Sequence, residues 1–212
     1  MKWGIFMKYT MYQEESSMVS NGKYEQMKRT LQAEQPKVTW EAFQLRKLQF
    51  LGASDGAPNY FLCVKNQDKE QIYLEKKYIQ NKIYYKKCTK VTLEEYGRIY
   101  RGDVEWMKNH RNPLLADFYL QATLNHLCPG HLTESSREMM HCRKEGYVIF
   151  QKKIERAAGS RIGLFEEPYM MLPCLNEGKV LVTYRKVVTL PVVISSMLQS
   201  GEDWGEDLGF VF

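Results

Sequence analysis

Apolar and polar residues alternate most clearly between residues 59 and 92. The segment NYFLCVKNQDKEQIYLEKKYIQNKIYYKKCTKVT contains three short apolar-rich runs, interrupted at 66–68 and at 80–81. Aromatic and β-branched residues are frequent in the runs, and turn-forming residues separate them, which is typical of strands joined by hairpins. The segment therefore predicts an antiparallel meander of three strands.

Helix start and stop signals surround this meander. Thr92 and Glu95 form a capping box that predicts a helix over LEEYGRIY. Proline favours the first turn of a helix and disfavours helical backbone in the residue before it. The sequence therefore predicts further helices at 113–127, which begins at a proline, at 191–200, which also begins at one, and at 23–35, which precedes one.

The rest of the chain is mostly strand-like. Residues 3–11, 146–154 and 179–188 are rich in β-prone residues, and 38–51 is ambiguous between strand and helix. A cluster of turn residues, GASDGAPN, occupies 52–59. Strands that alternate irregularly with helices predict an α+β fold with an antiparallel sheet.

Composition favours an ordinary globular protein. The chain has 212 residues, of which 44% are hydrophobic and 26% charged, with a formal net charge of +5. This length predicts a single domain over 1–212. The five cysteines contain no C-x-x-C pair, so we expect reduced thiols in a cytoplasmic protein rather than a disulfide framework. We see no apolar run long enough for a membrane span and no signal peptide.

The charged residues of the predicted strands fall on particular faces. A period of two places Tyr73, Glu75 and Lys77 on one face, and Lys86 shares a face with Cys88. Thr183 and Arg185 likewise share a face, opposite Val180, Val182 and Tyr184. If the sheet curls into a barrel, these faces line its interior, where Lys and Arg suit a phosphate chain. A half-exposed sheet with solvated charges is the alternative.

Several segments resemble one family. They are LEKK at 74–77, Asn81, Lys86, the run from Thr92 to Tyr96, GDVEW at 102–106, SSREMM at 135–140 and LPCLNEGKVLVTYRK at 172–186. In this order they resemble the vacuolar-transporter-chaperone (VTC) domain, the polyphosphate polymerase branch of the CYTH-like triphosphate tunnel proteins. The similarity is strongest over 60–198, and residues 1–58 match only weakly.

The resemblance implies a fold and a site. The implied fold is an eight-stranded antiparallel β-barrel with helices packed on the outside. The implied activity transfers the terminal phosphate of ATP to polyphosphate, with a divalent metal that is usually manganese. Carried over residue by residue, the ligand-binding residues are Lys8, Lys77, Lys86, Arg137 and Arg185, and the metal-binding residues are Glu75 and Glu138.

The chain departs from the family pattern at most catalytic positions. Paired arginines of the family fall on Phe61 and Cys63, and the carboxylate of the opening strand falls on Phe6. An Arg and an Asp of a later strand fall on Tyr147 and Gln151. The Glu of the late strand, an implied metal ligand, falls on Thr183, and the terminal S-K-Y motif is missing. Each lost transition-state contact costs about 10²–10³ in rate, so we expect little turnover.

Three functional interpretations follow. The leading one is a catalytically impaired tunnel protein that binds a phosphate-rich anion, polyphosphate or a nucleotide. In this interpretation no cofactor is expected, and manganese or magnesium would be needed only with residual activity. The alternatives are a divergent but active polyphosphate polymerase and a scaffold or protein-interaction module with a filled barrel. We expect no specific nucleic acid partner, because the chain lacks a dense basic patch interleaved with aromatic residues.

Overall fold

The computed structural model describes most of the chain in two compact units. The described residues are 14–34, 38–53, 59–80, 83–141, 147–159, 161–185 and 192–199. The described residues of the first unit lie within 46–132 and 159–168, and those of the second lie within 14–45, 133–158 and 169–199. Strands β2 and β6 contribute residues to both units, and each unit is described by itself below.

The sheet of the first unit contains the predicted meander. Its strands follow the order β6-β2-β3-β4-β5, in which β3 pairs antiparallel with β4, and β4 pairs antiparallel with β5. The three predicted strands and their antiparallel arrangement are therefore confirmed. The bounds are β2 (Thr39–Leu51), β3 (Asn59–Lys65), β4 (Ile72–Gln80), β5 (Ile83–Val91) and β6 (Cys128–His141).

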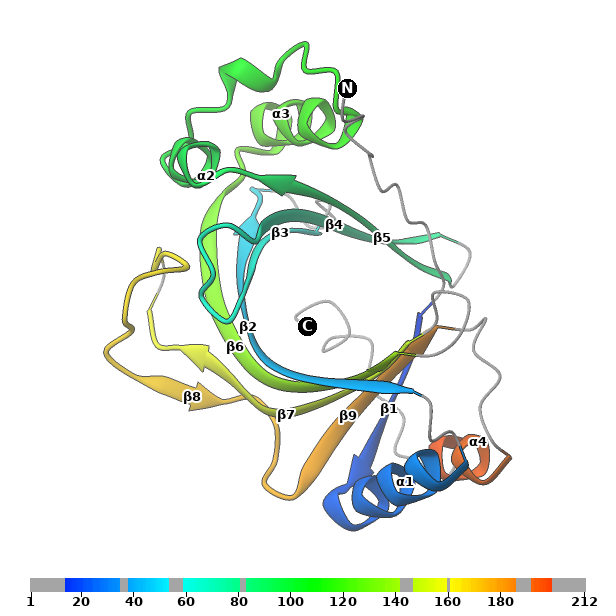
Figure 1. Ribbon diagram of the computed structural model, residues 1–212. Coiled ribbons are helices and arrows are strands. Elements are labelled where there is room, and N and C mark those ends of the chain that lie inside the picture. The colour runs from blue at the N-terminus through cyan, green and yellow to red at the C-terminus, as the bar shows by residue number, and fades with distance from the viewer. Residues whose placement is uncertain are drawn as a thin grey trace. The chain divides into compact units, whose positions relative to one another are not determined.

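Helices of the first unit cover one face of its sheet. They are α2 (Leu93–Tyr100), the short 3₁₀ helix η1 (Glu105–Met107) and α3 (Pro113–Asn125). In Figure 1, α2 and α3 lie next to β5. Phe118 of α3 packs edge-to-face on Phe50 and on Tyr60, with 5.0 Å between ring centroids in each pair. Asp117 accepts hydrogen bonds from Tyr60 Oη and, at 2.7 Å, from Lys76 Nζ, which ties α3 to β3 and β4.

The sheet of the second unit follows the order β1-β9-β7-β6-β2, with β8 paired to β7. Strand β9 pairs antiparallel with β1 and β7, and β7 also pairs antiparallel with β6 and β8. The bounds are β1 (Glu14–Ser20), β7 (Tyr147–Ala157), β8 (Met171–Pro173) and β9 (Lys179–Arg185).

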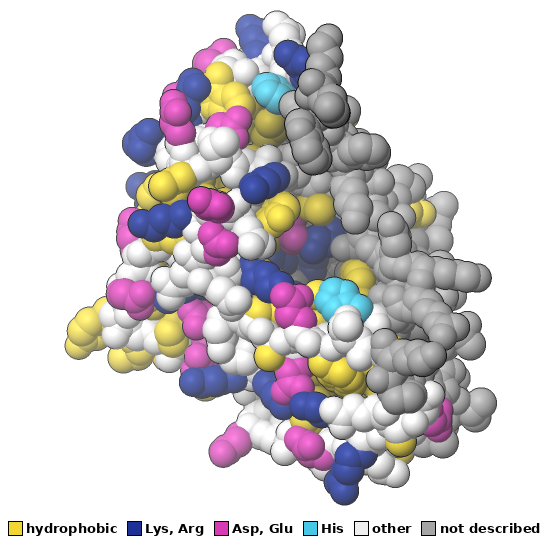
Figure 2. All heavy atoms as spheres, viewed as in Figure 1, with side chains coloured by type: hydrophobic (Ala, Val, Ile, Leu, Met, Phe, Trp, Pro, Cys, Tyr) yellow, Lys and Arg dark blue, Asp and Glu magenta, His cyan; other side chains and the backbone are white. Residues whose placement is uncertain are grey.

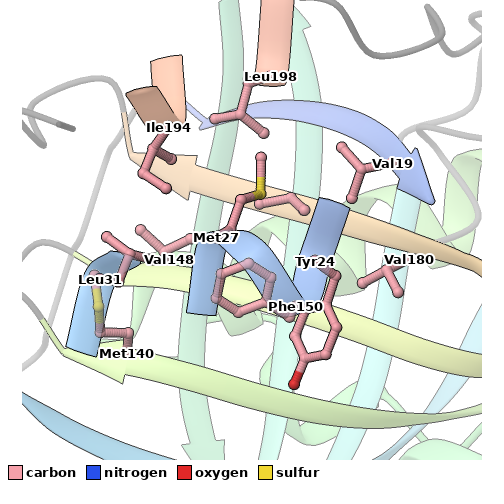
Figure 3. Packing of buried hydrophobic residues seen from close by; sticks show 11 residues of the cluster. Val19, Tyr24, Met27, Leu31, Met140, Val148, Phe150, Val180, Ile194 and Leu198 are labelled. Carbon is pink, nitrogen blue, oxygen red and sulfur yellow. The ribbon is translucent and has the colours of Figure 1, made fainter. Parts of the chain in front are cut away.

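Two helices bury the hydrophobic core of the second unit. Helix α1 (Asn21–Glu34) and helix α4 (Val192–Gln199) lie side by side against the sheet (Figure 1). Figure 3 shows how their side chains interlock with those of the strands. The cluster consists of Val19, Tyr24, Met27, Leu31, Met140, Val148, Phe150, Val180, Val182, Ile194 and Leu198.

The α+β class and the antiparallel sheet are confirmed. Residues 39–51, which were ambiguous in the sequence, form strand β2, and the helices expected at 23–35, 93–100, 113–127 and 191–200 are all present within a few residues. The described residues contain nine strands, one more than the eight implied by the resemblance, and β8 has only three residues. The strand expected at 3–11 lies outside the described residues.

No helix among the described residues is long and apolar enough to cross a membrane.

Candidate functional site

Glu75 lies at the centre of a charged cluster in the first unit. In the registers of β4, Glu75 pairs with Phe61 on β3 and with Cys88 on β5, and Lys77 pairs with Lys86. Directly paired residues share a face of the sheet. Tyr60 and Lys76, which contact α3, alternate with them and therefore point to the other face. The shared face predicted for Glu75, Lys77 and Lys86 is thus confirmed, and it is the face away from α3.

Lysines bracket the carboxylate of Glu75. Lys86 Nζ lies 2.5 Å from Glu75 Oε1, and Lys47 Nζ of β2 lies 3.6 Å from Glu75 Oε2. The Lys47 and Glu75 side chains are only 4% and 9% exposed, so this pair is screened little by water. Burial alone would raise the pKa of the Glu75 carboxyl, but the charges of Lys86, Lys47 and Lys77 together hold it well below its ordinary value. Glu75 is therefore an ionised, buried anion.

An aromatic ring and a thiol complete this face. Lys47 Nζ lies 4.0 Å from the centroid of the Phe61 ring, and Lys77 Nζ lies 5.9 Å from the same centroid. Both distances are in the cation–π range. Cys63 is 2% exposed, and its burial, with the nearby negative charge of Glu75, raises the pKa of its thiol to about 12. Of the two interpretations open for Cys63, a reactive thiol or a small buried hydrophobe, this environment favours the second.

Glu138 lies on a different surface from the one that the resemblance implies. Arg137 and Glu138 are consecutive residues of β6, so they point to opposite faces of the strand. Glu138 accepts hydrogen bonds from Lys28 Nζ at 2.5 Å and Tyr24 Oη at 3.0 Å through Oε2, and from Lys152 Nζ at 3.0 Å through Oε1. Burial alone would raise the pKa of Glu138, but these bonds lower it to about 2. Glu138 therefore anchors α1 to the sheet of the second unit.

Arg137 lies on the opposite face of that sheet. It pairs across β6 and β7 with Gln151, and its Nε donates to Ser135 Oγ at 2.9 Å. Gln151 Nε2 in turn lies 3.4 Å from Thr183 Oγ1, which lies 2.9 Å from Ser16 Oγ. The predicted separation of Thr183 from Val180 and Val182, which belong to the helix-covered core, is thereby confirmed.

Two predicted ligand-binding residues cannot be placed. Lys8 lies outside the described residues, and only the backbone of Arg185 is described, opposite Glu14 in the register of β1 and β9. Of the seven predicted site residues, the structure brings together Glu75, Lys77 and Lys86.

The sequence interpretation did not select Lys47. This lysine lies in the part of the chain that matches the family only weakly, within a segment, 38–51, that is ambiguous between strand and helix. If 38–51 is assigned as a strand, its period of two places Arg46 and Lys47 on opposite faces. In the structure Arg46 Nη1 donates to the backbone oxygens of Leu164 and Glu166, each at 3.2 Å, while Lys47 reaches Glu75.

The donor groups present do not fit the divalent metal that the resemblance implies. Hard divalent cations take several oxygen ligands, mostly carboxylates. Glu75 Oε2 is buried and accepts no hydrogen bond, but it faces the ammonium group of Lys47, which would repel a cation. Within the described part of the chain, no three His, Cys, Asp or Glu side chains gather closely enough to hold a metal ion.

Charges of both signs are mixed over the face of the molecule that Figure 2 shows. The candidate site is therefore defined by its contacts and burial rather than by a broad basic surface on that face.

Comparison with known proteins identifies the fold. No protein-family model matches the chain, and no curated protein matches it. Among solved structures, a proposed adenylate cyclase from Bacillus halodurans is similar over 97% of this chain and 100% of its own, with 9% identity and a TM-score of 0.59. HpAC1 from Hippeastrum, a proposed adenylyl cyclase with a dominant triphosphatase activity, covers 95% of each chain with 9% identity and a TM-score of 0.53.

A third solved structure is similar over most of this chain. A chain of the Schizosaccharomyces pombe Mediator head module is similar over 90% of each chain, with 8% identity and a TM-score of 0.50. At such identities the likeness shows the fold alone. The two cyclase-like neighbours share this fold, and both the CYTH-like triphosphate tunnel superfamily and its VTC branch stay predictions for this chain.

Proposed function

We propose that this chain binds a phosphate-rich anion, polyphosphate or a nucleotide, and has lost most of the catalytic capacity of an ancestral tunnel enzyme. The observation that carries the proposal is the gathering of Lys47, Lys77 and Lys86 around the single carboxylate of Glu75. The triphosphatase activity named for the Hippeastrum protein supports the choice of a phosphate ligand.

The physical basis is charge-assisted hydrogen bonding. Ammonium groups on neighbouring strands present repeated donors to phosphate oxygens, and each such bond contributes about 1.5–3 kcal/mol. Lys47 is buried, so its positive charge acts through a medium less polar than water, where its attraction to an anion is stronger. Glu75 also holds the Lys86 side chain in place before the ligand arrives.

Loss of catalysis is proposed on the residues that replace family charges. Phe61 occupies a position where the resemblance implies an arginine, and it is 1% exposed beside Lys47. Gln151 and Thr183 are neutral where carboxylates are implied. Phosphoryl transfer depends on positioning and charge neutralisation, so these replacements remove the groups on which the rate depends.

The test is anion binding measured by calorimetry, with tripolyphosphate, long-chain polyphosphate and ATP titrated separately. We expect Lys86→Gln to weaken binding by about 10- to 100-fold, the equivalent of one charge-assisted bond. The matched control is Lys87→Gln, which removes the same charge from the next residue of β5, on the opposite face, where Lys87 Nζ lies 5.3 Å from the Tyr78 ring centroid. Equal weakening by both variants would contradict a site on the Glu75 face.

Catalysis is tested with the same samples. Incubation with ATP and Mn²⁺ followed by gel analysis should show no polymer, and phosphate release should stay at the buffer rate. Polymer formation would contradict the proposed loss of activity and favour a divergent polyphosphate polymerase.

A second candidate is a protein-interaction module that binds no anion. Phe61 and Cys63, which are 1% and 2% exposed, fill part of the face on which the ligand would lie. The Mediator head chain provides a similar fold in a multiprotein assembly. Under this alternative none of the three anions would bind or raise the melting temperature. A bound ligand at 100 times its Kd would stabilise the protein by about 2.7 kcal/mol.

A further inference from the structure

Both oxygens of Glu75 are already directed at cations that belong to the protein. Oε1 lies 2.5 Å from Lys86 Nζ, and Oε2 lies 3.6 Å from Lys47 Nζ. A divalent cation bound to Glu75 would have to lie beside two ammonium groups in a buried environment, where repulsion between like charges is strong. The carboxylate is thus neutralised by lysines in the position where the resemblance implies a metal ligand.

Glu138, the other implied metal ligand, is engaged in the same way. Lys28 Nζ and Lys152 Nζ lie 2.5 Å and 3.0 Å from its two oxygens. It also lies on the face of its own sheet that α1 covers, since it bonds to Tyr24 of the buried core. A cation at Glu138 would therefore have to displace the contacts that hold α1 in place.

The two positions where the resemblance implies further carboxylates in the second unit carry a neutral pair. Gln151 and Thr183 are 4% and 7% exposed, and Gln151 Nε2 lies 3.4 Å from Thr183 Oγ1. Ser16 Oγ continues this chain of hydrogen bonds at 2.9 Å from Thr183 Oγ1. Neutral amide and hydroxyl groups are weak ligands for Mn²⁺ or Mg²⁺ compared with carboxylates. The side chains at 151 and 183 are nevertheless in contact, so carboxylates introduced at both positions would lie close enough to bind the same cation.

We infer that this protein binds its anion without a divalent cation, because Lys47 and Lys86 supply at Glu75 the positive charge that a metal ion would otherwise provide. The inference rests on the proposed function for the anion, whereas the absence of a metal site can be tested without any anion. It also assigns the Gln151–Thr183 pair as the place where metal binding was lost.

The first experiment measures Mn²⁺ binding directly by electron paramagnetic resonance, in which free Mn²⁺ gives a signal that is lost on binding. Wild-type protein, added at the same concentration as the Mn²⁺, should leave the signal of free Mn²⁺ unchanged. The double variant Gln151→Asp/Thr183→Glu should reduce it, and the size-matched neutral control Gln151→Asn/Thr183→Gln should not. Circular dichroism checks that the variants fold. If the double variant does not fold, the measurement on the wild-type protein still shows whether this protein binds Mn²⁺.

The second experiment titrates tripolyphosphate into wild-type protein in EDTA and again with Mn²⁺. Binding in EDTA, with no tightening by Mn²⁺, supports the inference. Loss of the wild-type Mn²⁺ signal, or anion binding that requires Mn²⁺, would overturn it and leave the proposed anion binding intact. Absence of binding in both buffers would overturn the proposed function and the inference with it.

Discussion

The carboxylate of Glu75 is buried between lysines, so its replacement changes stability and ligand binding in opposite directions. Glu75→Gln leaves Lys47 and Lys86 without their anionic partner, and breaking a buried ion pair from one side costs about 3–5 kcal/mol. We expect a lower urea midpoint for this variant. Tripolyphosphate should bind more tightly to Glu75→Gln than to the wild-type protein, because a negative charge has been removed from beside the ligand.

The matched control for this prediction is Glu70→Gln in the turn between β3 and β4, where the side chain is exposed. Its unfolding free energy should stay within about 0.5 kcal/mol of wild type. If Glu75→Gln were equally harmless, Glu75 would not be the buried partner of the lysines.

Cys63 should be the least reactive described cysteine. Its thiol has a pKa raised to about 12 and is buried, so the thiolate that reacts with iodoacetamide is scarce. Cys128 is exposed and should be modified first. Mass spectrometry of the native protein after timed alkylation measures both sites. Rapid modification of Cys63 would show that the Glu75 face is open to reagents.

Among the elements, α2 depends on signals that are local in sequence. Thr92 Oγ1 accepts from Glu95 N at 3.1 Å, and Glu95 Oε2 accepts from Thr92 N at 2.7 Å, which completes the capping box expected from the sequence. Thr92→Ala should lower the free energy of unfolding by about 1 kcal/mol. Thr92→Ser keeps the hydroxyl and should recover most of this loss. Urea unfolding measures the stability of both variants. If both lost the same unfolding free energy, the hydroxyl cap would not be the cause of the loss.

Elements without local signals were not predicted from the residue pattern alone. Strand β6 contains Pro129 and Gly130 at its start, and its remainder, with SSREMM, favours no single state. It is a strand because it pairs with β7 and places Met140 in the core of the second unit. Strand β1 is equally polar and depends on its pairing with β9. Neither partner can be found by local pattern alone.

For the whole molecule, acid should unfold the protein through its ion-paired carboxylates, Glu75 and Glu138. The pKa of Glu138 is lowered from 4.5 to about 2, and that of Glu75 is also lowered. A carboxyl whose pKa is lower in the folded state stabilises the fold above its unfolded pKa, and this contribution is lost as the pH falls towards the folded pKa. Stability should therefore decrease from about pH 4.5 towards pH 2.

The control for acid unfolding is Glu138→Gln, compared with wild type in urea at neutral pH and at about pH 3. The variant should be less stable at neutral pH and should lose less stability on acidification, because one titrating group has been removed. If both proteins lost the same unfolding free energy on acidification, the effect would belong to other carboxyl groups.

The candidate site was predictable only in part. Alternation was enough to place Glu75 with Lys77 on one face of β4 and Lys86 with Cys88 on one face of β5, since a strand has a fixed period of two, and the register of the two strands joins these faces. The same rule separates Arg137 from Glu138, which the family comparison had grouped in one site. Lys47 could not be assigned to this face because its strand was ambiguous, and its contact with Glu75 joins residues distant in the chain.

By itself, the sequence determined the features that depend on neighbouring residues. These are the strands of the β3–β5 meander, the capping box of α2, the proline at the start of α3, and the faces of β4 and β5 that carry Glu75, Lys77 and Lys86. Only the tertiary structure decided which charges meet. Ion pairing depends on distance in space, so the capture of Glu75 by Lys47 and Lys86, and of Glu138 by Lys28 and Lys152, appears only once the strands and helices are packed.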